Sequence, residues 1–330
     1  MKKLLGLLAI LAIAAVGFVY WQLRQPYRAF GAPVMIEFPR GTSTSQMASM
    51  LADNGVIRSP WLFLAARAFR RGVHLQAGEY QFTRQASPLE VYSRIARGDI
   101  YYMQLQIPEG FNMFDVANAV AKLGTMSADA FLAAARDPSL IRDLDPDAPT
   151  LEGYLFPSTY RILPKTTARQ ICKMMTDEFR VQWKNLAAAA HAPVHDTVTL
   201  ASLVEREARL AQERTLVASV FQNRLRLGMK LDCDPTTVYA ALLDGRYTGA
   251  IHQSDLASEN PYNTYTHAGL PPGPIANPGI GSITAALTPT VTPYLYFVAR
   301  ADGSGGHTFS ESLQQHQAAV THYRRAVANH

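Results

Sequence analysis

The chain has 330 residues, of which 48% are hydrophobic and 17% charged, and its net charge is +5. This composition is typical of a folded protein with room for two domains, and it excludes a disordered chain. The basic residues form no long run, so nucleic acid is not an expected partner. Two cysteines, Cys172 and Cys233, are too few for a disulfide framework, and no zinc-binding motif accompanies them.

An uncharged apolar segment, residues 4–23, opens the chain. At about 1.5 Å per residue, a helix of this length reaches about 30 Å, the thickness of the hydrocarbon layer. Lys2 and Lys3 precede the segment, and Tyr20 and Trp21 lie near its end. We therefore expect a membrane-spanning helix with the N-terminus in the cytoplasm and the rest of the chain outside. The alternative is a cleaved signal peptide, because an Ala-Ile-Ala triplet resembles a cleavage site, but the apolar run continues past it.

One phrase occurs twice. VMIEFPRG at 34–41 returns as MQLQIPEG at 103–110, and further matches follow at about the same offset. Each copy leads to a segment with Gly, Tyr and Phe, at 77–82 and at 152–157, which we interpret as a closing strand. The sequence therefore predicts an internal duplication of the order strand, helix, helix, strand.

A further helix is expected from SPLEVYSRIARG, which begins at Ser87 with Glu90 in a capping box and stops at Gly98. A small βααβ-type module thus fills about 33–100. Its function remains open between a sugar-binding module and a structural spacer.

The C-terminal half begins with a helix predicted over about 166–190. Two consecutive helices follow, broken near Gln212 and closed by Gly228. Residues 257–282 are rich in Pro, Gly, Asn and Tyr, which predicts a long ordered loop of the kind that carries function. A strand, a Gly-rich hairpin and a terminal helix over about 311–328 complete the chain.

Two glutamates in the first of these helices differ in their surroundings. If the helix covers 199–211, Glu207 falls inside the apolar stripe that contains Leu200. Glu205 points to the flank, one turn before Arg209, where it can form an ordinary surface pair. Glu207 is therefore the unusual carboxyl group of the pair.

A carboxyl group in apolar surroundings has a raised pKa and holds its proton near neutral pH, as a general acid must. The alternative is a structural role for Glu207, buried and paired with Arg214 or Arg224. The sequence contains no Ser/His/Asp order, phosphate-binding loop or dinucleotide fingerprint that would indicate another chemistry.

Several segments together resemble the endolytic murein transglycosylase family, the YceG-like proteins. They are LEGYLFPSTY, LASLVEREA, ERTLVASVFQNRLRLGMKLDCDPTTVYA, YNTYTHAGLPPGPIANPG and PYLYFVARADGSGGHTFSESLQQH. The resemblance runs from the apolar segment almost to the C-terminus.

The resemblance implies a bitopic α+β protein of the bacterial inner membrane with its bulk in the periplasm. The expected parts are a cytoplasmic tail 1–3, a transmembrane helix 4–23, a linker 24–32, a LysM-like subdomain 33–100 and a mixed α+β catalytic domain 101–330 with a helix-borne glutamate.

The implied activity is cleavage of the bond between N-acetylmuramic acid and N-acetylglucosamine within nascent glycan strands. It leaves 1,6-anhydro-muramic acid ends, ends strand elongation and requires no cofactor or metal. The implied partners are peptidoglycan glycan strands, the inner membrane and peptidoglycan synthases.

Carried over by motif, the catalytic glutamate is Glu207, and Glu205 is the alternative acid. Ala208 follows it where the family pattern leads us to expect threonine, so another donor must orient the acid. The candidate substrate-binding residues, for which turn or packing roles are equally compatible, are Glu152, Gln222, Asn223, Tyr262, Asn263 and Tyr265.

Two alternatives stay open. If Glu152, Asp232 or Asp234 lay about 5 Å from Glu207, a retaining muramidase would be possible. A non-catalytic peptidoglycan-binding scaffold for synthases would use the anchor and the LysM-like region equally well.

Overall fold

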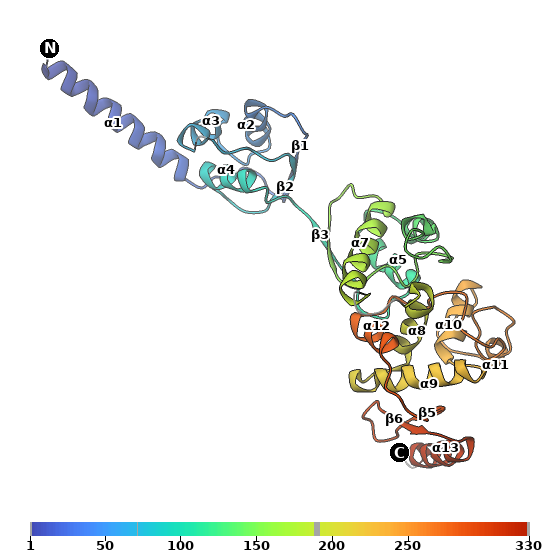
Figure 1. Cartoon of the computed structure of the whole chain (residues 1–330). Coiled ribbons are helices and arrows are strands. Elements are labelled where there is room, and N and C mark those ends of the chain that lie inside the picture. Colours follow the sequence, from blue (N-terminus) through green and yellow to red (C-terminus); the bar gives the residue numbers. More distant parts are fainter. Residues whose placement is uncertain (1, 71, 188–191, 329–330) are drawn as a thin grey trace. The chain divides into compact units, whose positions relative to one another are not determined.

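The structure, a computed structural model of the whole chain, describes residues 2–70, 72–187 and 192–328. The chain divides into two compact units, Met1–Tyr102 and Met103–His330, here called unit 1 and unit 2. Helices dominate both, and the described residues form three two-stranded antiparallel sheets (Figure 1). The predicted mixed α+β class is confirmed.

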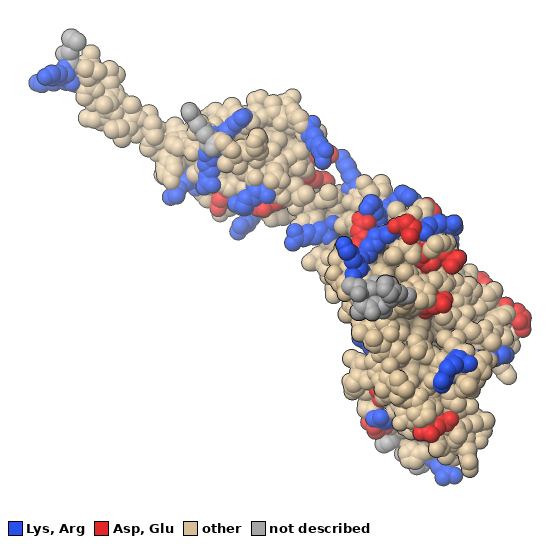
Figure 2. Space-filling model, in the orientation of Figure 1, with Lys and Arg blue, Asp and Glu red and all other residues tan. Residues whose placement is uncertain are grey.

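Helix α1, Lys2–Arg24, is exposed along almost its whole length. Within the described ranges it is the one helix long and apolar enough to cross a membrane. Figure 2 shows it as an uncharged rod with basic side chains at its N-terminal tip. Near its other end Leu23 is fully buried in the core of unit 1. The predicted N-terminal apolar helix is therefore confirmed, and its last turn is part of the fold that follows.

The rest of unit 1 consists of β1 (Val34–Phe38), α2 (Thr44–Asp53), α3 (Pro60–Phe69), β2 (Gly78–Phe82) and α4 (Pro88–Arg97). The strands pair antiparallel with Ile36 opposite Tyr80, and both side chains are buried because alternate residues of a strand face the core. Helix α4 begins with the predicted capping box, in which Ser87 and Glu90 accept each other's backbone N–H. It ends at Gly98 in the left-handed conformation, φ 71°.

Unit 2 opens with the same order of elements, β3 (Met103–Gln106), α5 (Met113–Ala121), α6 (Ala128–Ala135) and β4 (Thr159–Ile162). The duplication is visible in the turns. Gly41 and Gly110 have φ of 90° and 78°, and Gly55 and Gly124 have φ of 69° and 75°. Glycine adopts this region without steric cost, so the two copies share their turn geometry as well as their element order.

The closing strand of the second copy lies later in the chain than its sequence predicts. Residues 152–157 form a buried turn, and the strand that pairs with β3 begins at Thr159. Gly153 has φ 87°, and the Leu155 N–H donates to Asn277 Oδ1 at 2.9 Å instead of to a neighbouring strand. The prediction of a strand at 152–157 is wrong because the distant side chain of Asn277, and not a neighbouring strand, accepts a backbone N–H of this segment.

The remaining elements are η1 (Pro138–Leu140), α7 (Ala168–Ala187), α8 (Val194–Glu207), η2 (Ala211–Glu213), α9 (Arg214–Arg226), α10 (Asp234–Leu243), α11 (Gln253–Leu256), α12 (Ile280–Leu287), β5 (Tyr296–Ala299), β6 (His307–Ser310) and α13 (Leu313–Ala328). The helix expected over 166–190 is confirmed as α7, and residues 188–190 lie outside the described residues. The break near Gln212 is the 3-10 turn η2. The 257–282 segment is a loop until α12 begins, whereas α10 had no counterpart in the sequence analysis.

Helix α8 lies at the centre of unit 2, where α9, α10 and α12 pack against it. Its residues from Thr197 to Val204 are all buried, so this part of the helix is surrounded by the core. The two ends of the helix approach the surface, and its last turn carries Glu205 and Glu207. The fold thus places both glutamates at the C-terminal end of a core helix.

Candidate active site

Glu207 is the last residue of α8. The helix ends there because Ala208 takes an extended conformation, with φ −85° and ψ 99°. The helix expected over 199–211 therefore stops four residues early. Unpaired carbonyl groups give a helix C-terminus a partial negative charge, which disfavours an ionised carboxylate. The position of Glu207 in the helix thus favours its protonated form.

The side chain of Glu207 accepts a hydrogen bond from the Cys233 thiol, with 3.2 Å between Sγ and Oε1. Burial raises the pKa of Glu207, and the charge of Asp234 raises it further. The thiol hydrogen bond and the charges of His307 and Arg206 oppose this effect, but the pKa remains above its ordinary value. Glu207 therefore keeps its proton to a higher pH than a free glutamic acid.

Cys233 is a donor that stays protonated. It is 1% exposed, and burial together with the neighbouring Glu207 raises the pKa of its thiol well above the ordinary value. Its backbone N–H donates to Thr264 Oγ1 at 3.0 Å, which fastens the start of α10 to the loop that contains Thr264. Because Ala208 stands where threonine was expected, another donor has to orient Glu207, and the Cys233 thiol is in position to do so.

The two arginines considered as partners of Glu207 are engaged elsewhere. Arg214 lies 3.5 Å from Glu205 and 3.5 Å from Glu109, measured between guanidinium nitrogen and carboxylate oxygen. Arg224 pairs with Asp232 at 3.0 Å and donates to backbone carbonyl groups around it. In the described part of the chain, Glu207 is thus held by a neutral thiol and by no guanidinium.

Glu205 is not on the surface. Its side chain is 7% exposed, one oxygen faces Arg214, and the other accepts the Gly279 N–H at 3.0 Å. The expected surface pair with Arg209 is wrong, because the loop before α12 closes over this side of α8. Glu205 therefore has an ionic partner and a backbone donor, and it links α8, α9 and the start of α12.

Glu152 lies in the interior, 1% exposed. Its two oxygens accept the Met113 N–H at 2.7 Å and the Asn277 amide at 3.0 Å, and Tyr239 also hydrogen-bonds to it. Burial raises the pKa of Glu152 to about 8. The residue fastens the first turn of α5 to the loop before α12, so its contacts are those of a structural carboxyl group.

Three of the other candidates bind backbone. The amide group of Asn263, fully buried, donates to three carbonyl groups of the segment 255–258. Asn223 donates to the carbonyl groups of Thr292 and Tyr294 at 2.8 and 2.9 Å. Gln222 is exposed and donates weakly to Ala286 at 3.3 Å. Asn263 and Asn223 shape loops, and Gln222 lies on an exposed position of α9.

The two tyrosines differ. Tyr265 donates its hydroxyl to Asp234 Oδ1 at 2.5 Å, and Asp234 adjoins Cys233, so this tyrosine belongs to the surroundings of Glu207. Tyr262 packs against Tyr239 with ring centroids 5.1 Å apart. Among the candidates, Tyr265 is therefore the one whose contacts lead to the acid.

Sequence reasoning missed His307, whose charge acts on Glu207, and its partner Glu213. The His307 ring nitrogen Nδ1 lies 2.8 Å from Glu213 Oε2, and the His307 N–H also donates to that carboxylate. Both residues are more than nine-tenths buried, and the charge of His307 acts on Glu207. The Gly-Gly-His turn was noted only as a hairpin. The glycines of this turn could have indicated a close approach of another side chain, since a Cβ on Gly306 would lie 2.9 Å from a Glu213 carboxylate oxygen.

The arrangement offers one carboxylic acid with one oxygen bonded to a thiol. The structure gives the second oxygen of Glu207 no hydrogen-bond partner among the described residues. A protonated carboxyl group with one oxygen fixed and one available can donate a proton to a bound oxygen atom and later take one back.

The chain is similar to proteins of known families. The YceG-like family matches residues 36–322. An endolytic murein transglycosylase of Bacillus subtilis is 35% identical over 309 residues, covering 88% of this chain and 84% of the relative. Another, of Streptococcus pneumoniae, is 27% identical over 327 residues, covering 90% of this chain but 59% of that longer protein. A crystal structure of a YceG-like protein from Listeria monocytogenes matches with a TM-score of 0.58 and 31% identity, over 87% of this chain and 98% of the other.

Proposed function

The chain belongs to the YceG-like family, and from this membership we propose that it is an endolytic murein transglycosylase whose general acid is Glu207. It is a lyase that cleaves the glycan of peptidoglycan within the strand, the activity for which its relatives are named. The observation that supports the assignment of the acid is the half-buried carboxyl group of Glu207 at the end of α8, with its raised pKa and its thiol donor.

The first step of the proposed mechanism is proton donation. Protonated Glu207 gives its proton to the glycosidic oxygen between N-acetylmuramic acid and N-acetylglucosamine. As the bond from the muramic anomeric carbon to that oxygen breaks, N-acetylglucosamine leaves with a new hydroxyl group. Glu207 is left as a carboxylate, and the Cys233 thiol stabilises that charge through its bond to Oε1.

The second step closes the anhydro ring. The C6 hydroxyl of the muramic acid attacks the anomeric carbon, and its proton passes to the Glu207 carboxylate. The acid is thereby restored, no water is consumed, and the product end is 1,6-anhydro-muramic acid. Because the attacking hydroxyl is part of the same sugar, its effective concentration is high and the enzyme needs no second nucleophile.

The placement of the other carboxyl groups favours this lone acid over a retaining muramidase, which needs a second carboxylate about 5 Å from the first. Glu152 is bonded on both oxygens in the interior, and Asp232 is paired with Arg224. Asp234 is close enough for its charge to act on Glu207, but it is bound to the Tyr265 hydroxyl. We therefore assign Asp234 an electrostatic role.

We place α1 in the inner membrane, and the rest of unit 1 and all of unit 2 in the periplasm. The support is the charge order of the helix, with Lys2 and Lys3 at its start and Tyr20 and Trp21 near its end. The βααβ order of unit 1 supports a LysM-like module that binds glycan. A membrane-bound enzyme with such a module would meet nascent strands and the synthases that extend them, where cleavage ends strand elongation.

Product analysis in water enriched in oxygen-18 tests this function. Purified full-length protein in detergent is incubated with peptidoglycan glycan strands, and the ends are identified by mass spectrometry. We expect anhydro ends without oxygen-18, and the same products from the Asp234→Asn variant. Labelled reducing ends would contradict the lytic mechanism and indicate a hydrolase. Binding of strands without any cleavage would instead support the non-catalytic scaffold.

A further inference from the structure

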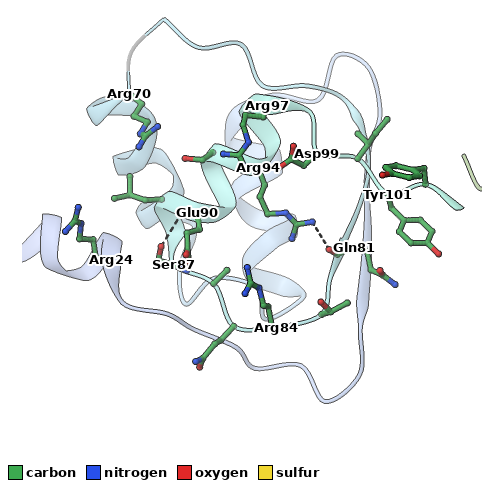
Figure 3. A pocket seen from close by; sticks show the side chains of 17 residues that line it. Arg24, Arg70, Gln81, Arg84, Ser87, Glu90, Arg94, Arg97, Asp99 and Tyr101 are labelled. Carbon is green, nitrogen blue, oxygen red and sulfur yellow. Dashed lines mark hydrogen bonds and ion pairs between the residues drawn. The ribbon is translucent and has the colours of Figure 1, made fainter. Parts of the chain in front are cut away.

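Unit 1 contains a cavity of about 950 Å³ that the proposed reaction does not use. Every residue that lines it belongs to the range 24–102, so it is formed within this unit alone. Its lining is rich in basic side chains from four segments of the unit. They are Arg24, Arg70, Arg84, Arg94 and Arg97 (Figure 3).

The positive charge of the cavity is only partly neutralised. The lining contains two carboxylates, Glu90 and Asp99, against its five arginines, an excess of three positive charges. Asp99 pairs with Arg97 at 2.7 Å, and the Glu90 carboxylate accepts the Ser87 N–H in the cap of α4. Both carboxylates therefore already have donors.

Three arginines have no carboxylate within ion-pair distance in the described ranges. They are Arg24 at the end of α1, Arg70 just after α3, and Arg84 in the loop after β2. Figure 3 shows Arg24 and Arg70 on one side of α4 and Arg84 below it. Guanidinium groups that face a common cavity without acidic partners form a site for an anion, and their planar forks suit phosphate oxygens.

The location of the cavity identifies where this anion comes from. Arg24 closes the helix that can cross the membrane, and its guanidinium lies 5.0 Å from the ring centre of Tyr20. The Tyr20 ring also contacts Phe69, at 6.1 Å between centroids, and Phe69 directly precedes Arg70. Tyr20, Trp21 and Phe69 are all exposed, as aromatic residues at a membrane interface are. With α1 across the membrane, the cavity would lie at the level of the lipid headgroups.

We propose that this cavity is a binding site for the phosphate of a membrane lipid at the outer surface of the inner membrane. The phosphate would be held by Arg24, Arg70 and Arg84. Arg94 also lines the cavity, but its guanidinium donates to the Gln81 carbonyl at 3.0 Å. The inference rests on α1 spanning the membrane and is independent of the assignment of Glu207.

Binding at this site would hold unit 1 against the membrane surface. Leu23 is in the core of the unit, and α1 contacts both α3 and α4, so the anchor and the site move together. Two lipid phosphates fit the chemistry: the headgroup of an anionic phospholipid, and the pyrophosphate of the polyprenyl lipid that carries growing glycan. The second would place the end of a nascent strand at a set position on the protein.

A lipid-binding measurement on the full-length protein tests the proposal. The probe is a short-chain fluorescent phosphatidylglycerol, and diacylglycerol with the same fluorophore, which has no phosphate, is the neutral reference, both in a neutral detergent. We expect the anionic probe to bind more tightly. The double variant Arg70→Gln/Arg84→Gln should weaken that binding about thirtyfold, because each basic residue near an anionic lipid surface contributes about fivefold.

The matched control is Arg40→Gln/Arg142→Gln, which removes two exposed arginines outside the cavity. It should bind the anionic probe like the wild type, and Arg70→Lys/Arg84→Lys should retain part of the affinity. All these arginines are exposed, so circular dichroism should show unchanged unfolding midpoints. Equal binding of the neutral lipid, or an equal loss in the control variant, would overturn the proposal.

Competition distinguishes the two lipid sources. If polyprenyl pyrophosphate displaces the probe at lower concentration than unlabelled phosphatidylglycerol, the site is for the carrier lipid. The reverse order assigns it to phospholipid. Displacement by soluble peptidoglycan fragments, with no effect of either lipid, would refute a lipid site and indicate a glycan site instead.

Discussion

Replacing Cys233 by alanine removes the hydrogen-bond donor that holds Glu207. The thiol lies 3.2 Å from Oε1, and Cys233 is 1% exposed, so solvent has little access to replace it. The bond favours the ionised carboxylate, and its loss should therefore raise the pKa of Glu207 further. A hydrogen bond to a charged group contributes about 1.5–3 kcal/mol, and a thiol is a weak donor, so we expect a loss at the lower end of this range.

This change is visible in the pH dependence of kcat. The first step needs protonated Glu207, so the alkaline limb of the profile follows its pKa and should move to higher pH in Cys233→Ala. Cys233→Ser keeps a donor and should stay near the wild type. The kcat of the alanine variant should fall about tenfold, because the acid loses its orientation. The assay is the rate of anhydro-end formation over a wide pH range. An alkaline limb that stays in place or moves down in Cys233→Ala would refute the role of the thiol.

Three further predictions concern the stability of the protein and the length of the glycan strands that it cuts. Burial raises the pKa of Glu152 from 4.5 to about 8, so the free energy of unfolding should fall as the pH rises between these values. In Glu152→Gln, the free energy of unfolding measured by urea titration should change less with pH over this range. Gly153→Ala should lower stability by about 2–4 kcal/mol in the same assay, since φ is 87° and the new Cβ would lie 2.4 Å from Pro274 Cγ. Gly124→Ala, with open space around it, should cost only about 1–2 kcal/mol, and an equal cost would contradict the steric argument. Deletion of residues 1–23 should lower the thermal midpoint of unit 1 more than a truncation that keeps Leu23, because the Leu23 side chain is fully buried. The same deletion should change the lengths of the glycan strands that the protein produces. An unchanged midpoint would contradict the first effect, and unchanged strand lengths would contradict the second.

The features that depend on local chemistry could be predicted from the sequence. The capping box at Ser87 and the left-handed conformation of Gly98 each depend only on residues within one turn of that end of α4. The duplication was readable because the turns at Gly41 and Gly110 need the same residue type in the same place. The apolar segment at the N-terminus needs only length and composition to be recognised.

The predictions that were wrong concern features that depend on contacts between residues far apart in the sequence. The backbone of 152–157 is taken up by Asn277, more than a hundred positions later. Glu205 is covered by Gly279 and Arg214, which no helical wheel of α8 can include. Such contacts form only once loops have folded over the helix, so periodicity describes the helix and not what covers it.

The candidate site combines both kinds of feature. The apolar pattern of α8 singled out Glu207, although the helix ends earlier than the pattern suggests. The donor on its carboxyl group comes from Cys233, 26 residues away, and the nearby charge comes from His307. A buried cysteine is most often a small apolar residue, so its sequence position gave no indication of this hydrogen bond.

The central claim is that Glu207, and not Glu205, is the acid, and a paired comparison of Glu207→Gln with Glu205→Gln tests it most directly. Both full-length variants are assayed for anhydro ends, strand binding and unfolding midpoint. We expect Glu207→Gln to bind strands, unfold like the wild type and form no anhydro ends. Glu205→Gln should unfold at lower temperature, because Arg214 loses a partner, yet still form anhydro ends. Anhydro ends from Glu207→Gln, or their complete loss in a folded Glu205→Gln, would contradict the account.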